Sequence, residues 1–342
     1  MIIPFFIPHA GCTHQCVFCN QKNITGKNAA PDPSSLPETI RSWLRTARSA
    51  GPVQVAFYGG SFTALPPDLQ RAYLAPVQPF IDAGEIACIR ISTRPDAIFA
   101  DILEHLKQHR VGIVELGAQS MDDGVLTRSG RGHSADDTVH AVRLLREHGF
   151  TVGLQLMPGL PGDSADIFGD TVRRVIELRP DVVRIYPALV IRDTPLERLY
   201  RAGKYAPLSL DEAVVWCRDA MARFEAAGIQ VIRVGLQPSE ELERPGTIVA
   251  GPYHPALRQL AESSRFLERV RSVLAQAPAR STGIRISVNP RDLSSAIGQN
   301  RRNVLLLQRE FGLASLNFGT DGSIPKGEIR CHPACVPPSP AV

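Results

Sequence analysis

Three cysteines lie within eight residues near the start of the chain, at Cys12, Cys16 and Cys19. Their spacing is C-x3-C-x2-C, in a chain that has only seven cysteines among its 342 residues. Thiolates are soft ligands that suit iron–sulfur clusters and zinc. Three thiolates can hold three irons of a [4Fe–4S] cluster and leave the fourth iron open to a substrate or cofactor. The spacing therefore predicts an iron–sulfur centre with one open iron.

Two other metal sites stay open for this loop. A zinc ion could take His9 or His14 as its fourth ligand, or a distant cysteine could complete a structural cluster. Closed zinc sites usually have a second pair of ligands at C-x2-C or C-x2-H spacing, and none follows here, so we favour the open cluster. A disulfide is the weakest alternative, because the chain is far longer than a stapled mini-domain and no secretory signal precedes the cysteines.

The motif C-x3-C-x-aromatic-C, with Phe18 as its aromatic residue, resembles the signature of the radical S-adenosylmethionine (radical SAM) superfamily. In that family SAM chelates the open iron, and one electron from the cluster cleaves SAM into methionine and a 5′-deoxyadenosyl radical that takes hydrogen from the substrate. The resemblance implies a [4Fe–4S] cluster and SAM as cofactors, with the three cysteines as iron ligands and Phe18 beside SAM. It also implies a flavodoxin or ferredoxin as electron donor.

Composition is ordinary for a globular protein, with 44% hydrophobic and 21% charged residues and a net charge of +4. No apolar run approaches the length of a membrane span. The apolar start, residues 1–7, is too short and too poor in basic residues to be a signal peptide, so we expect a cytoplasmic protein with no membrane partner. Arginine outnumbers lysine, which suits phosphate contacts, although scattered surface arginines would give the same count.

The first ~240 residues alternate short apolar runs with amphipathic helical patterns. Strands are expected at 2–7, 53–57, 87–91, 112–116, 151–156 and 182–186. Helices are expected at 36–48, 68–83, 97–109, 135–148 and 165–178, with a further helix at 209–227 and a strand at 229–234. Six β/α units predict an α/β fold with parallel strands. With the resemblance, this is a radical SAM partial (β/α)6 TIM-like barrel, whose functional side chains lie at the carboxyl ends of the strands.

The second and third strands end in candidate SAM contacts. Gly59, Gly60 and Ser61 resemble the family's Gly-Gly-Glu segment, whose backbone meets the SAM amino group, and here Ser61 replaces the glutamate. Glycines let a backbone approach a ligand closely. Ser92 and Arg94 are expected at the barrel mouth, where the ribose and carboxylate of SAM need polar partners. The alternative for that segment is a simple helix start.

The next three strands end in the candidate catalytic residues: Glu115, Gln119, Arg184 and Tyr186. Gln119 is also a candidate SAM contact, as is Met157, which lies in a segment resembling the one that packs against adenine in the family. Glu115 could equally be a buried, paired structural residue. Arg184 could neutralise a carboxylate or phosphate, or form a salt bridge to Glu115 or Asp181. Possible hydrogen donors are Cys88, Cys217 and Tyr186.

Four stretches taken together resemble the Elongator-protein-like branch of the superfamily, whose best-known member modifies the wobble uridine of tRNA. They are Gly-Gly-Ser-Phe-Thr, Ser-Thr-Arg-Pro-Asp, Glu-Leu-Gly-Ala-Gln-Ser and Gly-Leu-Pro-Gly-Asp. Oxygen-independent coproporphyrinogen oxidases are similar over the same span. Elongator subunits also carry an acetyltransferase domain and space their first two cysteines more widely. We find no acetyl-CoA loop here and do not expect carboxymethylation from acetyl-CoA.

The C-terminal part has a different pattern. We expect a barrel at 1–240, a connector with a helix at 241–280, a KH-like domain at 281–331 and a disordered tail at 332–342. The β-α-loop-α-β run after Gly283 resembles a KH RNA-binding domain, with Gly298, Asn300, Arg301 and Arg302 as the RNA contacts. The usual KH loop is G-x-x-G; here Arg301 replaces the second glycine, so arginine–phosphate contacts could take over from the backbone. A small domain that only braces the barrel is the alternative.

Cys331 and Cys335 form another C-x3-C near the end, with His332 between them. These side chains could bind zinc or support a second cluster, but we favour free thiols in a frayed tail.

Three functions follow, in order of preference. The first is a radical SAM enzyme that modifies RNA, with tRNA as the expected substrate. The second is a radical SAM enzyme acting on a small molecule, as coproporphyrinogen oxidases do. The third is a non-catalytic RNA-binding metalloprotein.

Overall fold

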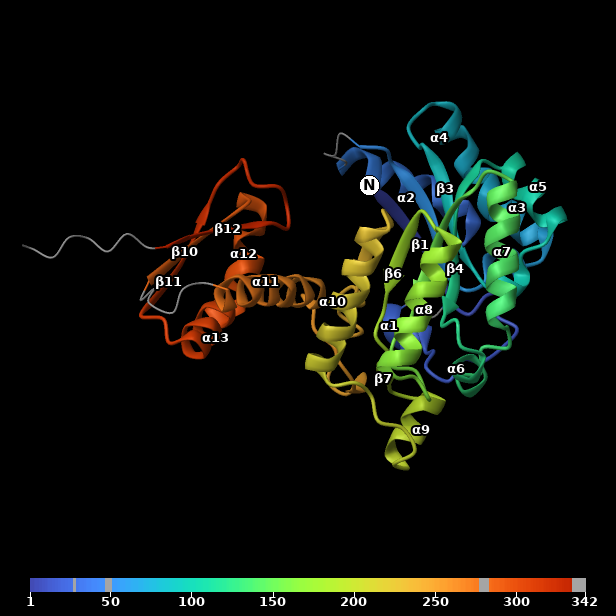
Figure 1. The fold of residues 1–342 in the computed structure, drawn as a ribbon. Helices are drawn as coiled ribbons and strands as arrows, with labels where there is room; N and C mark the ends of the chain where they lie inside the picture. Colours follow the sequence, from blue (N-terminus) through green and yellow to red (C-terminus); the bar gives the residue numbers. More distant parts are fainter. Residues whose placement is uncertain (27–28, 47–50, 277–282, 334–342) are drawn as a thin grey trace, which may run out of the picture. The chain divides into compact units, whose positions relative to one another are not determined.

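The protein folds into two compact units in a computed structural model that describes residues 1–26, 29–46, 51–276 and 283–333 (Figure 1). The first unit contains Met1–Trp216 and Ala220–Pro255, and the second contains Cys217–Asp219 and the chain from Ala256 onward.

A seven-stranded sheet forms the first unit, in the order β1-β2-β3-β4-β5-β6-β8. Its strands are β1 (Ile2–Ile7), β2 (Gln54–Gly59), β3 (Cys88–Thr93), β4 (Val111–Gln119), β5 (Thr151–Leu156), β6 (Val182–Ile185) and β8 (Gln230–Val234). All neighbouring strands are parallel, and the sheet curls into a half barrel (Figure 1). The predicted partial barrel is confirmed.

Helices connect these strands, as the alternating pattern predicts. They are α1 (Gln21–Thr25), α2 (Leu36–Thr46), α3 (Pro67–Leu74), α4 (Gln78–Asp82), α5 (Ala100–Gln108), α6 (Asp123–Arg128), α7 (Ala135–Glu147), α8 (Ala165–Leu178), α9 (Pro195–Arg201) and α10 (Leu210–Ala226). Both α7 and α10 begin with a capping box, in which the Ser134 or Ser209 side chain accepts from the third backbone N–H of its helix. In Figure 1, α1, α6 and α9 lie at the lower end of this unit, toward which the parallel strands run.

One predicted helix is wrong. The segment 68–83 is not a single helix but α3, a short 3₁₀ turn over Ala75–Val77, and α4. Pro76 and Pro79 explain the break, because proline has no N–H to donate and its ring crowds the preceding turn.

The outward side chains of the sheet form the main core. Val55, Ile89 and Val114, from three adjacent strands, are all fully buried. Side chains of a strand alternate between its two faces, so the residues between them point into the half barrel. That inner face carries polar and charged side chains, which form part of the candidate site.

A small antiparallel pair, β7 (Val190–Ile191) with β9 (Ile248–Ala250), was not expected from the sequence. Its strands are two and three residues long, too short for a period to show. The pair holds the segment after β6 against the segment after β8 within the first unit.

The second unit contains α11 (Leu257–Ala275), β10 (Gly283–Val288), α12 (Leu293–Ile297), α13 (Arg302–Phe311), β11 (Ser315–Thr320) and β12 (Ile329–Pro333). Its sheet has the order β11-β10-β12, with β10 and β11 parallel and β12 antiparallel. The observed β10-α12-α13-β11 run has the elements expected after Gly283; its assignment as KH-like stays a prediction. Strand β12 was not predicted and extends to Pro333, so the segment 332–342, expected as a disordered tail, begins inside a strand. The rest of that tail lies outside the described residues.

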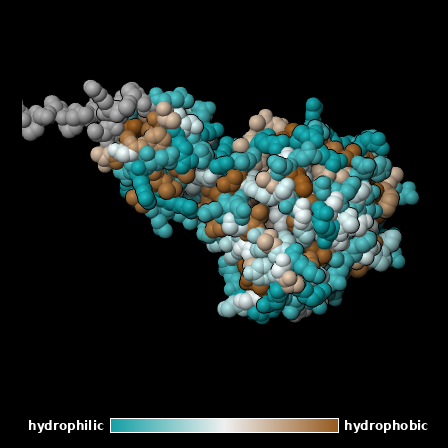
Figure 2. All heavy atoms as spheres, turned by 60° about the horizontal axis from the view of Figure 1, so that its bottom comes forward, coloured by the Kyte–Doolittle hydropathy of each residue, from teal (hydrophilic) through white to brown (hydrophobic). Residues whose placement is uncertain are grey.

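Among the described residues, no helix is both long and apolar enough to cross a bilayer. On the face shown in Figure 2, hydrophilic and hydrophobic residues are interspersed.

Candidate functional site

The cysteine loop is fixed to the end of β2 by backbone hydrogen bonds. It leaves β1 at Ile7, whose carbonyl accepts from the Gly60 N–H over 3.0 Å, and the Ala10 carbonyl accepts from the Ser61 N–H over 2.8 Å. A Cβ atom on Gly60 would lie 2.0 Å from the Ala10 carbonyl oxygen. Gly60 therefore has a local reason to be glycine: a side chain there would push the cysteine loop away from the sheet.

The three cysteines differ in exposure: Cys12 is exposed, Cys19 is partly buried and Cys16 is buried. Burial raises the pKa of the Cys19 thiol to about 12, and repulsion from the other two thiolates adds to this rise. Burial and the Cys16 thiolate also raise the pKa of Cys12, against the pull of two nearby arginines. The three thiols of this loop therefore lie near enough to influence one another's ionisation.

Arg131 and Arg94 are those two arginines, and both are buried. Arg131 Nη1 donates to Cys16 Sγ over 3.1 Å, and its Nη2 donates to the Gly117 carbonyl over 2.5 Å. Arg94 donates to both carboxylate oxygens of Asp96 at 2.9 Å and to the Arg131 carbonyl at 2.5 Å. Arg94 was a predicted SAM contact, whereas Arg131 was not predicted. The only feature of the sequence that could have drawn attention to Arg131 is the pair of glycines that flank it in the loop between α6 and α7.

His133, in the same loop, was also missed. Its Nε2 lies 3.3 Å from the Ala118 carbonyl, and its Nδ1 is buried with no partner among the described residues. Burial, with help from the charges of Arg131 and Arg94, lowers the pKa of His133 to about 4. The imidazole is therefore neutral at physiological pH. A pocket of about 440 Å³ beside the cysteine loop is lined by His14, Asp123, Thr127, Gly130, Gly132, His133 and Ser134.

The Gly59–Ser61 segment lies next to the cysteine loop. Gln21, from α1, donates to the Gly59 carbonyl over 2.6 Å and accepts from the His9 N–H over 2.6 Å, a bridge not foreseen from the sequence. Ser61 is buried, and its hydroxyl bonds the Thr93 hydroxyl at 3.0 Å and accepts from the backbone N–H of Arg94, the residue after β3, over 3.2 Å. The serine that replaces the family's glutamate therefore fastens β2 to the end of β3.

Phe18 and Met157, both predicted SAM contacts, pack on one apolar cluster whose buried members are Val125, Leu160 and Ala188. Gln119 lies where a bulge interrupts the β4–β5 pairing, with φ of 68°. Its carbonyl accepts from the Met157 N–H over 2.8 Å, but its side-chain oxygen is buried without a partner in the described parts of the chain. A buried acceptor without a donor is costly, so this position suits a ligand that donates a hydrogen bond.

Glu115 is the centre of an ion-pair network on the inner face of the half barrel. It is 1% exposed and accepts from Arg90 Nη1 and from Arg184 Nε, each over 2.6 Å. Burial opposes its ionisation, but the two guanidiniums outweigh burial and lower its pKa. Of the alternatives left open for Arg184, the salt bridge to Glu115 is the one observed. The buried structural role for Glu115 therefore accounts for its contacts, and its role as a catalytic residue stays a prediction.

Polar side chains from other strands complete this network. Gln155 Nε2 donates to Glu115 over 3.2 Å and to Ser92 over 3.4 Å. Arg184 reaches the hydroxyl of Tyr58 at 3.1 Å and that of Tyr186 at 3.4 Å. Tyr58 lies on β2 and Tyr186 directly follows β6, so the contacts of Arg184 reach across the half barrel. Of the other possible hydrogen donors, Cys217 is fully buried and Cys88 is partly buried.

These residues fit the implied cofactors. Three cysteine thiols in one loop, with two guanidiniums beside them, suit a thiolate-bound iron–sulfur cluster, whose net charge is negative. The unpartnered oxygen of Gln119 and the unpartnered Nε of Arg131, both buried, suit a cofactor that has donors and a carboxylate. Within the described ranges, no three His, Cys, Asp or Glu side chains have the geometry to hold a single metal ion.

The second unit holds the predicted RNA contacts in the loop between α12 and α13. Gly298, Asn300 and Arg301 all have positive φ, at 77°, 51° and 62°. Arg301 thus keeps the left-handed conformation that a glycine adopts at no steric cost. The Asn303 side chain, buried below the loop, donates to three carbonyls, including that of Ser263 in α11 at 2.9 Å. The loop is therefore held from below, and Arg301 and Arg302 are exposed at its surface.

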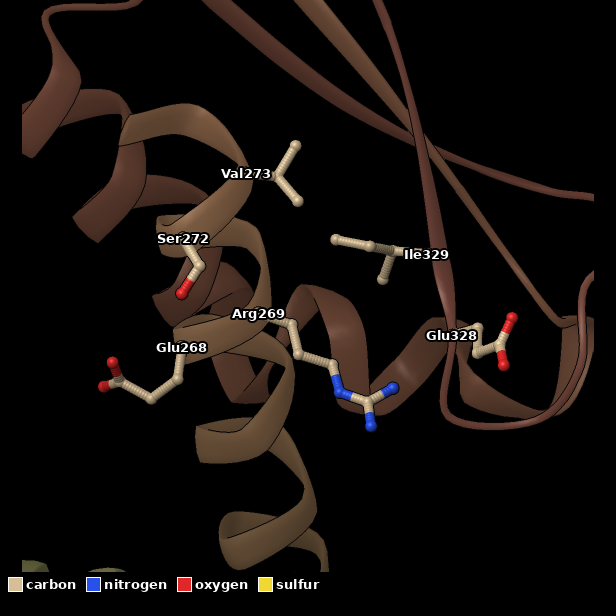
Figure 3. A pocket seen from close by; sticks show the side chains of 6 residues that line it. All are labelled: Glu268, Arg269, Ser272, Val273, Glu328 and Ile329. Atoms are coloured by element: carbon tan, nitrogen blue, oxygen red, sulfur yellow. The ribbon is translucent and has the colours of Figure 1, made fainter. Parts of the chain in front are cut away.

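The pocket in Figure 3 lies elsewhere in the second unit and contains none of the predicted contacts. It has a volume of about 460 Å³ and is lined by Glu268, Arg269, Ser272, Val273, Glu328 and Ile329. The Arg269 side chain extends from α11 in the direction of Glu328 (Figure 3). Cys331 is partly buried beside the core of this unit, and Cys335 lies outside the described residues.

The half barrel and its cysteine loop define the class of protein. The family described as "Radical SAM superfamily" matches residues 6–175, and the "Radical_SAM C-terminal domain" matches residues 180–269. The chain belongs to the radical SAM superfamily.

Similar proteins indicate which branch of the superfamily this chain resembles. It is 33% identical to a tRNA uridine(34) acetyltransferase of Methanocaldococcus jannaschii over 146 residues, which are 41% of this chain and 27% of that protein. It is 27% identical to Elongator complex protein 3 of Schizosaccharomyces pombe over 247 residues, 60% of this chain and 45% of the relative. The predicted resemblance to the Elongator-like branch is confirmed. The match spans only about a quarter to a half of these relatives.

The solved structure of archaeal Methanocaldococcus infernus Elp3 superposes with a TM-score of 0.62 at 23% identity, covering 79% of this chain and 63% of that one. This likeness supports the fold.

Proposed function

We propose that this protein is a radical SAM enzyme that modifies RNA, with tRNA as the substrate. The observation that carries the proposal is the loop of three cysteines, fixed to β2 next to two buried arginines, at the carboxyl end of a radical SAM half barrel. Relatives named as tRNA uridine(34) acetyltransferases support an RNA substrate.

The chain's own residues have distinct parts in this proposal. Cys12, Cys16 and Cys19 would hold a [4Fe–4S] cluster, and the Gly59–Ser61 backbone, Gln119 and Met157 would hold SAM. Bound together, these cofactors would supply a radical that removes a hydrogen atom from the substrate. The buried arginines near the loop stabilise its thiolates by charge, and the apolar cluster around Phe18 excludes water from that side.

Anaerobic reconstitution tests the chemistry. The wild-type protein should take up iron and sulfide and, with dithionite, convert SAM to 5′-deoxyadenosine. Cys12→Ala, Cys16→Ala and Cys19→Ala should each abolish this conversion, whereas Cys217→Ala, at a buried cysteine outside the loop, should retain it. Full activity in any of the three loop variants would overturn the assignment of that cysteine as an iron ligand.

RNA binding is tested at the loop between α12 and α13. If Arg301 binds phosphate, Arg301→Gly should weaken tRNA binding in a gel shift and lower the salt slope by about one. The glycine is suited to the left-handed conformation of this position, so the variant removes the charge without straining the loop. The matched control is Arg309→Gln, which removes one positive charge from α13. Glutamine is used there because glycine would destabilise the helix.

If Arg301→Gly bound tRNA as tightly as the wild type, the RNA contact would be assigned to the loop backbone and not to the Arg301 side chain. No tRNA binding by the wild-type protein at low salt would favour the small-molecule substrate. Iron uptake without SAM cleavage would favour the non-catalytic RNA-binding protein. A flavodoxin or ferredoxin is the proposed source of the electron.

A further inference from the structure

The inner face of the half barrel holds more positive than negative charge. Glu115 is shared by Arg90 and Arg184, so one carboxylate neutralises only one of two guanidiniums. All three side chains are largely buried, with exposed fractions of 1%, 8% and 14%. Electrostatic interactions are strong at such a site because little water screens them.

A bulge in β8 adds a third guanidinium. Val183 pairs with Val231, but the next residue of β6, Arg184, pairs with Arg233, so β8 contains one extra residue, Ile232. In a regular strand Ile232 would face Arg184, and Arg233 would point to the opposite face. Bulges re-aim side chains in this way and are common near active sites. The extra residue therefore places Arg233 beside Arg184 on the inner face.

In the part of the chain that the structure describes, no carboxylate pairs with Arg233. Its Nε donates to the Gly235 carbonyl over 2.9 Å, and its terminal nitrogens have no hydrogen-bond or ion-pair partner among the described residues. The nearby groups that feel its charge are the phenols of Tyr186 and Tyr253. Tyr253 donates to Glu243 over 2.8 Å, and within the described residues Glu243 forms no ion pair with Arg233.

The phenols cannot supply the missing negative charge. Burial raises the pKa of Tyr58 and of Tyr186, so both stay protonated at neutral pH. Like charges directly opposite each other on neighbouring strands are destabilising. An oxyanion at this position would relieve that repulsion and accept charge-assisted hydrogen bonds, which are among the strongest in proteins.

We propose that Arg233 and Arg184, with the hydroxyls of Tyr58 and Tyr186, form an oxyanion-binding site inside the half barrel that takes a phosphate group of the substrate nucleotide. This rests on the proposed function, because an RNA substrate brings phosphates to the barrel. The carboxylate of SAM has the same chemistry, so the test must separate the two sources.

The test compares two probes that differ only in a phosphate, uridine 5′-monophosphate and uridine, on the reconstituted protein under anaerobic conditions. Titration should show tighter binding of the monophosphate. Arg233→Gln should weaken monophosphate binding at least tenfold and uridine binding by less than twofold, and Arg233→Lys should recover part of the loss. Arg143→Gln, at an arginine on the exposed face of α7, is the matched control and should change monophosphate binding by less than twofold.

SAM binding is measured on the same variants. A loss of SAM affinity in Arg233→Gln larger than the loss for the monophosphate would assign the site to the SAM carboxylate and overturn the proposal. Equal binding of uridine and its monophosphate by the wild type would also overturn it. Iron content and SAM cleavage of the wild type are scored separately, so failure of the proposed function is seen in those measurements and failure of the oxyanion site in the titrations.

Discussion

Glu115 is the residue on which the inner face of the half barrel depends. Its carboxylate is almost fully buried and forms ion pairs with two guanidiniums, one from β3 and one from β6. Removing one member of a buried ion pair is costly, because the remaining charge loses its partner without regaining water. The sequence could suggest that Glu115 was either structural or functional, but only the register of three strands shows which arginines it meets.

Glu115→Gln should therefore lower the free energy of unfolding by about 3–5 kcal/mol. Glutamine keeps the shape of the side chain and removes the charge. Glu177→Gln, which breaks an exposed pair with Arg173 on α8, is the control and should change stability by less than about 0.5 kcal/mol. Urea denaturation gives both values, and similar losses in the two variants would contradict the role assigned to Glu115.

His133 predicts a pH dependence. Its pKa is about 4 in the folded protein against 6.5 as the ordinary value, so the folded state requires the neutral imidazole. The stabilisation is complete above pH 6.5 and is lost as the pH falls toward 4. Between pH 7 and pH 4.5 the loss from this residue should be about 2–3 kcal/mol.

His133→Gln removes this titration while keeping a donor for the Ala118 carbonyl. Urea denaturation of the apoprotein at pH 7 and pH 4.5 should show a smaller pH-dependent loss in the variant than in the wild type. An identical loss in the two proteins would mean that His133 titrates in the folded state as it does in the unfolded state.

At the scale of elements, the junction between the cysteine loop and β2 is the tightest contact of the candidate site. Gly60→Ala would place a methyl group 2.0 Å from the Ala10 carbonyl oxygen. We expect the loop to shift and the variant to retain much less iron after reconstitution. Gly51→Ala is the matched control, since a Cβ there meets nothing within 4 Å, and it should bind iron as the wild type does. Equal iron content in both variants would show that the loop tolerates displacement.

The elements of the barrel were predictable where one pattern dominated. The runs at 2–7 and 151–156 match β1 and β5 residue for residue, because short, largely apolar segments bounded by turns are typical of a parallel sheet. The single helix predicted over 68–83 is wrong, because Pro76 and Pro79 interrupt a segment whose amphipathic spacing continues across them. The pair β7–β9 was missed because its strands are too short to show a period.

The residues of the candidate site were predictable only where they belong to a recognisable sequence motif. The spacing of Cys12, Cys16 and Cys19 indicated the loop, and the ends of β4, β5 and β6 indicated Gln119, Met157 and Arg184. Arg131 and His133 follow α6 at no recognisable spacing, and their closeness to the loop comes from the way the chain returns across the barrel end. Arg233 was missed for a different reason, because a bulge reverses the face that alternation would assign to it.

At the scale of the whole molecule, the second unit has a core of its own, formed by α11, α13 and the sheet around β10. Leu307→Ala removes a fully buried side chain of that core and should destabilise the unit by about 2–5 kcal/mol. We expect tRNA binding to fall while SAM cleavage by the barrel is retained. Hydrogen exchange resolved by peptide should show faster exchange in 283–333 and little change in 1–255.

Leu305→Ala is the matched control on the same helix, because Leu305 is 60% exposed and its removal should change stability by less than about 0.5 kcal/mol. If Leu307→Ala also accelerated exchange throughout the barrel, the two units would not be energetically separate.

The extra residue in β8 also has a consequence for how the strand tolerates a change of length. Deleting Ile232 would join Val231 directly to Arg233, restore regular alternation and leave Arg233 paired with Arg184 on the inner face. Turning Arg233 outward would instead require β8 to keep all its residues and to lose the bulge through a one-residue change of pairing. A codon lost at position 232 would therefore preserve the cation inside the barrel, so this guanidinium can persist in strands that differ by one residue in length.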